Sequence, residues 1–187
     1  MPKPWEDFPE VWKNEAQFCQ WLRSQSRRLW NRHPAKLSML KASAIPVTEE
    51  MRKTLNIHKM TKKVYRCAIC GCYHPAKNVE VDHTDEVVQF NTVEGWHVWV
   101  ERLLVCSTDN LRILCKPCHK IVSYSQKMHC SFEEAIVLKQ VVEFGKLSAT
   151  KQLAKLKEMT GLVEHPDFKS AAKRKAMYKK LLEKSDE

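Results

Sequence analysis

Residues 110–120 read NLRILCKPCHK, and this stretch decides how the centre of the chain is organised. Leu111–Leu114 alternates apolar and polar side chains, which predicts a half-buried strand. The strand runs directly into Cys115-Lys-Pro-Cys118, a CxxC pair that offers two thiols from one tight turn. His119 follows at once, so a metal that fixes this turn would also aim the imidazole.

A second pair with the same spacing, Cys67 and Cys70 in CAIC, lies upstream. In a reducing compartment, two CxxC pairs indicate thiolate coordination of a metal rather than disulfides. We expect Cys67, Cys70, Cys115 and Cys118 to bind a structural Zn²⁺, although the same four thiolates could hold an iron–sulfur cluster. Cys72 is close enough in sequence to compete for the metal. We expect the cysteines outside the two pairs to be small buried apolar residues: Cys19, Cys72, Cys106 and Cys130.

The segment between the pairs predicts a strand followed by a helix. Residues 79–83, VEVDH, alternate as a half-buried strand does. Residues 94–104 place five apolar side chains at helical spacing, namely Trp96, Trp99, Val100, Leu103 and Leu104. With a further helix over residues 120–127, the centre reads strand, inserted helix, strand, helix.

Polar residues of this module have the chemistry that phosphodiester hydrolysis needs. The reaction requires an activated water, charge neutralisation on the phosphoryl oxygens and a stabilised leaving oxyanion. A histidine is a competent general base at neutral pH, and a carboxylate with a second imidazole can hold a divalent ion. Because adjacent strand residues point to opposite faces, we assign His83 as the base and Asp82 as a metal ligand. The amide of Asn110 can bridge backbone groups across the loop and hold His83 in orientation.

The order of these residues, nested inside the CxxC pairs, resembles the HNH endonuclease family, specifically the phage-type members with a four-cysteine zinc site around a ββα-metal fold. The resemblance is clearest over residues 67–120, through CAIC, VEVDH, GWHVWVERLL and DNLRILCKPCHK, and the leader FCQWLRSQSRRLWNRHPAK is more loosely similar. It implies that His83 is the general base, that Asp82 and His119 bind a catalytic Mg²⁺ or Mn²⁺, and that Asn110 constrains the ββα loop. It also implies 5′-phosphate and 3′-hydroxyl product ends. The region after about residue 128 does not map onto the family.

The net charge of +10 lies outside the cysteine module. Residues 1–66 hold 14 Lys+Arg against 6 Asp+Glu, residues 67–150 hold 8 against 10, and residues 151–187 hold 10 against 6. We expect DNA to be gripped by these basic flanks, although solvated helices would show the same charge pattern. The candidate phosphate contacts are Arg23, Arg27, Arg28, Lys173, Arg174 and Lys175.

The expected fold class is α+β, with a small zinc-stapled ββα-metal core and mainly helical arms. The expected domains are a basic, Trp-rich arm at 1–63, the core at 64–128 and a basic helical region at 129–187. Residues 31–63 read as an irregular connection with short helices. The periodicity predicts longer helices over residues 12–30, 131–144, 149–159 and 167–183.

The chain contains no uncharged apolar run of about eighteen residues, and its first residues lack the pattern of a secretory signal. We therefore expect a cytoplasmic protein with no membrane segment, in the host cytoplasm if a phage or mobile element encodes it. The expected function is metal-dependent nicking or cleavage of DNA. The alternative is a non-catalytic zinc module that binds nucleic acid or a partner protein, in which Asp82, His83 and His119 would be structural.

Overall fold

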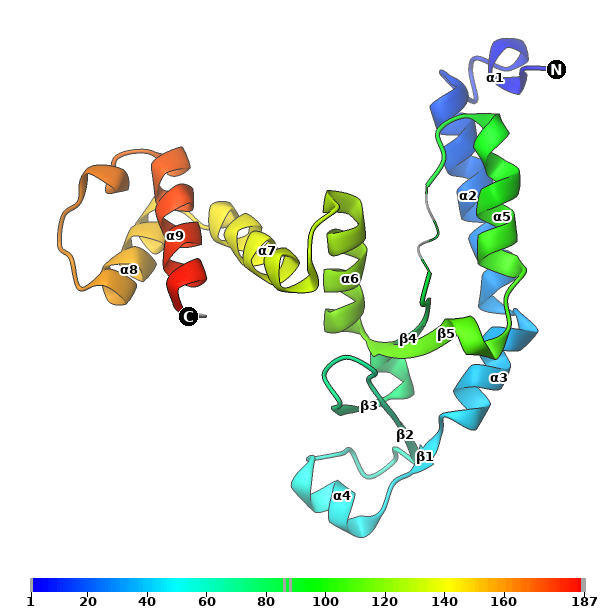
Figure 1. Cartoon of the computed structure of the whole chain (residues 1–187), viewed down its shortest axis with the longest axis horizontal. Coiled ribbons are helices and arrows are strands. Elements are labelled where there is room, and N and C mark those ends of the chain that lie inside the picture. The colour runs from blue at the N-terminus through cyan, green and yellow to red at the C-terminus, as the bar shows by residue number, and fades with distance from the viewer. Residues whose placement is uncertain (1, 86, 88, 186–187) are drawn as a thin grey trace. The chain divides into compact units, whose positions relative to one another are not determined.

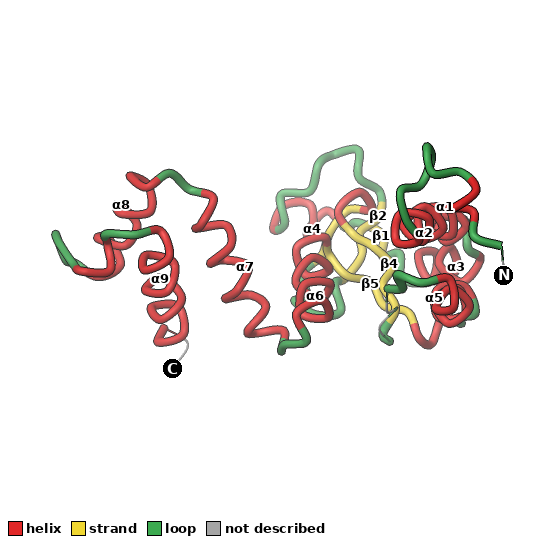
Figure 2. Tube along the Cα trace, turned by 90° about the horizontal axis from the view of Figure 1, so that it is seen from above, coloured by secondary structure: helices red, strands yellow, loops and turns green. Residues whose placement is uncertain are grey.

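The computed structural model describes residues 2–85, 87 and 89–185, and the chain divides into two compact units, residues 1–119 and 120–187. The described strands all belong to the first unit, whereas the second is helical (Figures 1 and 2). The chain is therefore α+β with small antiparallel sheets, as expected. The three-part division of the chain stays a prediction.

The first unit holds two antiparallel sheets among its described residues. One has the order β1-β2-β3, from Ile45–Pro46, Lys63–Arg66 and Tyr73–Pro75. The other pairs β4 (Val79–His83) with β5 (Leu111–Cys115), and its register places Asp82 opposite Arg112 and His83 opposite Leu111.

The predicted order of strand, helix, strand and helix is confirmed for the centre. Between β4 and β5 lies α5 (Trp96–Leu104), which starts after a 3₁₀ turn at Val93–Gly95 rather than at residue 94. After β5 comes α6 (Lys116–Met128), which starts four residues before the expected position. It can start there because Pro117 lies in the first helical turn, where a missing N–H costs nothing.

The N-terminal leader packs on the same core as the strands. Short α1 (Pro4–Asp7) precedes α2 (Glu15–Asn31), which begins after the expected Trp12 because the Asn14 side chain accepts from the Gln17 N–H and caps the helix there. Helices α2 and α5 run side by side (Figure 1). Trp30 from α2 and Trp99 from α5 belong to one buried cluster, which also takes in the apolar face of β4 and β5.

The connection between the leader and the cysteines carries short helices, as expected. They are α3 (Pro34–Ala42), which packs against β4 and β5, and α4 (Glu49–Thr54). Strand β1 lies between them and pairs with β2, which the sequence did not indicate.

The second unit is a small helical bundle around its own core. After the end of α6 it contains α7 (Phe132–Lys146), α8 (Ala149–Thr160) and α9 (Ala171–Ser185). The capping box expected at Ser131 is present. The helix expected from residue 167 begins at Ala171 instead, because Pro166–Phe168 forms a separate 3₁₀ turn. The core consists of Phe144, Leu156, Phe168 and Tyr178. None of the helices in the described residues has the length and apolar character needed to cross a membrane.

Candidate metal and catalytic site

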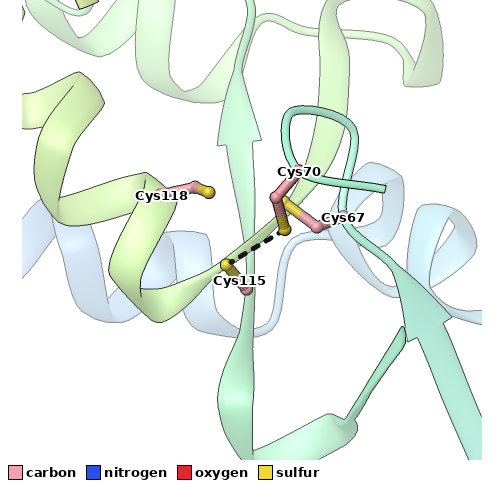
Figure 3. Close-up of side chains that lie close together, drawn as sticks. All are labelled: Cys67, Cys70, Cys115 and Cys118. Atoms are coloured by element: carbon pink, nitrogen blue, oxygen red, sulfur yellow. Dashed lines mark hydrogen bonds between the residues drawn. The ribbon is translucent and has the colours of Figure 1, made fainter. Parts of the chain in front are cut away.

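The four predicted cysteines come together in the first unit. Cys67 and Cys70 lie on the turn after β2, Cys115 ends β5 and Cys118 lies in the first turn of α6 (Figure 3). All four Sγ atoms lie within 4.8 Å of one another, and those of Cys70 and Cys115 are 3.9 Å apart. A tetrahedral zinc with Zn–S bonds of about 2.3 Å separates its thiolates by about 3.8 Å, so the cluster could hold a metal such as zinc.

The backbone fixes the first cysteine turn against β5. Gly71 adopts a left-handed conformation, with φ of 70°, which closes the turn directly after Cys70. The Ala68 N–H donates to the Ile113 carbonyl at 2.8 Å, and the Cys67 N–H donates to the Cys72 carbonyl at 2.9 Å. The first of these bonds joins the turn to β5, and the second closes the turn on itself.

The thiols have diverging acidities because burial and backbone N–H groups act on them unequally. Burial raises the pKa of Cys67, but backbone N–H groups, that of Cys115 foremost, outweigh it and lower the pKa to about 6. Burial and the neighbouring thiols raise the pKa of Cys118, and burial raises the pKa of Cys115. Neighbouring thiolates repel one another, so these thiols do not all ionise easily at once. A bound divalent cation would stabilise them as thiolates, as in a metal site.

Strand β4 separates the two predicted catalytic functions onto opposite faces, as its alternation indicated. Val79, Val81 and His83 are buried toward the core, and Glu80 and Asp82 lie on the other face. On that face His119 reaches both carboxylates: its Nε2 lies 3.5 Å from Asp82 Oδ1, and its Nδ1 lies 3.0 Å from Glu80 Oε2. The two expected ligands of a catalytic ion, Asp82 and His119, are thus neighbours.

Asp82 has a second partner that the sequence analysis did not name. Arg112, its cross-strand neighbour, approaches Asp82 Oδ2 with Nε at 3.0 Å and Nη2 at 2.9 Å. The guanidinium therefore occupies one carboxylate oxygen, and the other faces His119. The hydrogen bond with Asp82 raises the pKa of His119, against the opposing effect of burial.

His83 is buried inside the unit, and one of its ring nitrogens has a backbone partner. Its Nε2 lies 3.1 Å from the Leu103 carbonyl oxygen, which can only accept, so Nε2 carries the hydrogen and Nδ1 keeps its lone pair. Burial is the main effect that lowers the pKa of His83. The Trp30 ring packs against the imidazole, and His83 and Asn110 line a cavity of about 200 Å³ together with Asp85, Glu101, Arg102 and Val105.

Asn110 works differently from the expectation. Its side-chain oxygen accepts from the Ser107 N–H at 3.0 Å and completes a capping box inside its own 3₁₀ turn, Thr108–Asn110. The hydrogen bond across the loop is made by the backbone instead: the Thr84 N–H donates to the Asn110 carbonyl at 2.9 Å. The residue after His83 is therefore anchored by main chain, and the amide shapes the turn that presents this carbonyl.

The candidate phosphate contacts fall into two groups. Arg27, Arg28, Lys173 and Lys175 are exposed. Arg174 is buried instead: its Nε donates to Gln152 Oε1 and its Nη1 to the Phe168 carbonyl, both at 2.8 Å, so its assignment as a phosphate contact is wrong for this conformation. Arg23 is half-buried, with its guanidinium over the Phe90 ring and bonded to the Phe90 carbonyl.

Three residues of the site were missed by sequence reasoning: Trp30, Glu80 and Arg112. The alternation of β4 does place Glu80 on the face of Asp82, so that signal was available. The pairing of Asp82 with Arg112 depends on strand register, and the contact of Trp30 with His83 depends on helix packing. A local sequence pattern contains neither kind of information.

Comparison with known proteins adds no relative. The chain matches no family model, no curated protein and no solved structure. The chemistry of the site therefore has to follow from the chain's own residues.

Proposed function

We propose that the chain is a zinc-stabilised, metal-dependent endonuclease of the HNH type that hydrolyses phosphodiester bonds in DNA. The observation that carries the proposal is the meeting of Asp82 and His119, from β4 and α6, on the face of β4 opposite to His83. A carboxylate and an imidazole at this separation suit an ion, because two adjacent ligands on octahedral Mg²⁺, with bonds of about 2.1 Å, lie about 3.0 Å apart.

Asp82 Oδ1 and His119 Nε2 would hold Mg²⁺ or Mn²⁺, and their present separation of 3.5 Å needs only a small adjustment. When bound, such an ion supplies neutralising charge for the phosphoryl and leaving oxygens. Two protein ligands leave further positions open to phosphate and water.

His83 supplies the base in this proposal. Its Nδ1 takes a proton from a water molecule, the water oxygen bonds to phosphorus, and the bond from phosphorus to the 3′ oxygen breaks. The Leu103 carbonyl holds Nε2–H and so fixes the tautomer in which Nδ1 is the acceptor. The lowered pKa of His83 keeps the ring neutral and ready to accept at neutral pH.

Exposed basic residues would bind the DNA backbone. Arg27 and Arg28 on α2 and Lys173 and Lys175 on α9 are the candidates that the structure leaves accessible. With a net charge of +10, the chain attracts a polyanion whatever its sequence. Contacts of this kind give affinity and little sequence selectivity.

A plasmid-nicking assay tests the proposal. Supercoiled plasmid incubated with the zinc-loaded chain should be nicked with Mg²⁺ or Mn²⁺, and EDTA should stop the reaction. His83→Ala should abolish nicking while DNA binding persists, and His97→Ala, at an exposed histidine of α5, serves as the matched control. Metal-independent nicking, or full activity of His83→Ala, would contradict the proposed mechanism.

A second candidate function is favoured by one observation, the ion pair of Asp82 with Arg112. In this alternative the chain is a non-catalytic zinc module that binds nucleic acid, and the polar residues of β4 stabilise its fold. The two candidates differ in metal dependence, since a pure binder would show DNA affinity but no nicking with any divalent ion.

A further inference from the structure

We infer that Glu80 is the positioning residue for the metal ligand His119, an inference that rests on the proposed function. Glu80 Oε2 lies 3.0 Å from His119 Nδ1, whereas Asp82 Oδ1 lies 3.5 Å from His119 Nε2. One imidazole is thus shared between two carboxylates, one at each ring nitrogen.

The two carboxylates have different roles because the ring nitrogens point in different directions. An ion bound to Nε2 beside Asp82 would lie away from Glu80, so Glu80 would pair with the Nδ1–H group and would not bind the ion. A carboxylate on the second nitrogen of a metal-binding histidine fixes its tautomer and ring orientation and raises its basicity.

The fold places Glu80 there for a simple reason. Residues 80 and 82 share one face of β4, and α6 begins directly after the paired strand β5. The His119 side chain, in the first turns of α6, therefore reaches both carboxylates of this face. Rotation of the ring by half a turn would put Cδ2 in place of Nδ1 and Cε1 in place of Nε2, and the contact of Nδ1 with the Glu80 carboxylate opposes that rotation.

Arg112 completes the arrangement from the side of Asp82. Its Nε and Nη2 both contact Oδ2, which leaves Oδ1 directed at His119. Each ligand of the proposed ion is therefore oriented by its own charged partner: Asp82 by Arg112 and His119 by Glu80.

The test is Mn²⁺ affinity, measured by electron paramagnetic resonance of free Mn²⁺ with the full zinc-loaded chain and no DNA. Asp82→Ala and His119→Ala define the site. Glu80→Ala should weaken Mn²⁺ binding by about 10- to 100-fold, the usual effect of losing such a partner. Glu80→Gln, whose amide oxygen still accepts a hydrogen bond, should retain more of the affinity. Glu10→Ala, at an exposed carboxylate before α2, should bind as the unaltered chain does.

A second readout separates orientation from folding. With Mg²⁺ bound, the ring ¹⁵N shifts of His119 should show hydrogen on Nδ1 in the unaltered chain. In Glu80→Ala the population of that tautomer should fall, while the zinc content stays unchanged. Glu80 is 44% exposed at its side chain, so its loss should leave the fold intact. Unchanged Mn²⁺ affinity in Glu80→Ala, with loss in Asp82→Ala and His119→Ala, would overturn this inference and leave the proposed function standing. If the unaltered chain binds Mn²⁺ no better than Asp82→Ala does, the role of Glu80 and the proposed metal-dependent function are both overturned.

Discussion

Trp30 and His83 are in ring contact, with centroids 4.4 Å apart and planes inclined at 39°. The tryptophan comes from the last turn of α2, and His33 stacks on it with a centroid distance of 5.4 Å. The leader helix thus forms one wall around the proposed base. Under the proposed function, the helix therefore has a role besides carrying the basic residues Arg27 and Arg28.

Replacing Trp30 should therefore impair the reaction. Trp30→Leu should lower the single-turnover nicking rate by about tenfold or more, because a misplaced catalytic group loses the benefit of orientation. Trp30→Phe keeps an aromatic ring and should lose less. The matched control is Trp21→Leu on the same helix, where the side chain is 44% exposed. Equal rates for Trp30→Leu and Trp21→Leu would show that the wall has no catalytic role.

Removing one thiol should dismantle the cysteine cluster. Cys115→Ser should lose zinc and loosen β4 and β5, since binding of a structural zinc is folding free energy on the order of 10 kcal/mol. Cys72→Ser is the control, because Cys72 lies outside the four-cysteine group and is exposed, so the expectation that it is buried was wrong. Elemental analysis should find one zinc per chain in the control. No zinc in the unaltered chain, or an iron–sulfur absorption band, would refute the zinc assignment.

The pH dependence of nicking should move with the metal concentration. At saturating Mn²⁺ the rate follows deprotonation of His83, whose pKa burial lowers, so the rate should fall only below the ordinary histidine value of about 6.5. At limiting Mn²⁺ the ion competes with a proton for His119, whose pKa is raised by Asp82, so the fall should begin at higher pH. Rate profiles at the two concentrations measure this separation. If the two rate profiles coincide on their acidic side, the assignment of His83 as the base and of His119 as a metal ligand would be contradicted.

The exposed basic residues should set the salt dependence of DNA binding. Each neutralised phosphate contributes about −0.9 to the slope of log affinity against log salt on duplex DNA. Replacing Arg27 and Arg28 together, or Lys173 and Lys175 together, by alanine should weaken binding and flatten that slope by about 0.9 for each phosphate that is no longer neutralised. Fluorescence anisotropy over a salt series is the measurement. If both double variants keep the original slope, these faces are merely solvated.

Arg174→Ala should act on stability instead of on DNA affinity. The change leaves the Gln152 side-chain oxygen and the Phe168 carbonyl without their donors, and an unsatisfied buried polar group costs about 1–3 kcal/mol. Hydrogen exchange of α7, α8 and α9 should therefore accelerate. The Lys173→Ala control, at an exposed neighbour, should leave exchange unchanged. A loss of DNA affinity in Arg174→Ala with unaltered exchange would restore its assignment as a phosphate contact.

The centre of the chain could be predicted from the sequence because its strands, helices and cysteine turns each have a periodic pattern or a short motif. The alternation of residues 79–83 was enough to put Asp82 and His83 on opposite faces, and Ser131 with Glu134 was enough to start α7. The CxxC spacing sufficed to name four cysteines that do converge.

Features that depend on distant partners could not be predicted in this way. Arg174 reads as one more exposed cation on a basic helix, and only its contact with Gln152 on α8 shows otherwise. Arg112 reads as the polar residue of an alternating strand, and only the register of β4 and β5 pairs it with Asp82. The start of α2 has a local cause: the apolar periodicity extends back to Trp12, but the cap at Asn14 sets the first helical residue at Glu15.

The second cysteine pair and His119 lie within one five-residue stretch, residues 115–119. Synthesis from the N-terminus therefore delivers His83 and Asp82 well before the residues that complete both proposed metal sites. A nascent chain, or one cut short before residue 115, would lack half of the thiolates and one ligand of the catalytic ion at once. Under the proposed function, incomplete translation products cannot cleave DNA, and the ribosome must translate residues 115–119 before the chain can become a nuclease.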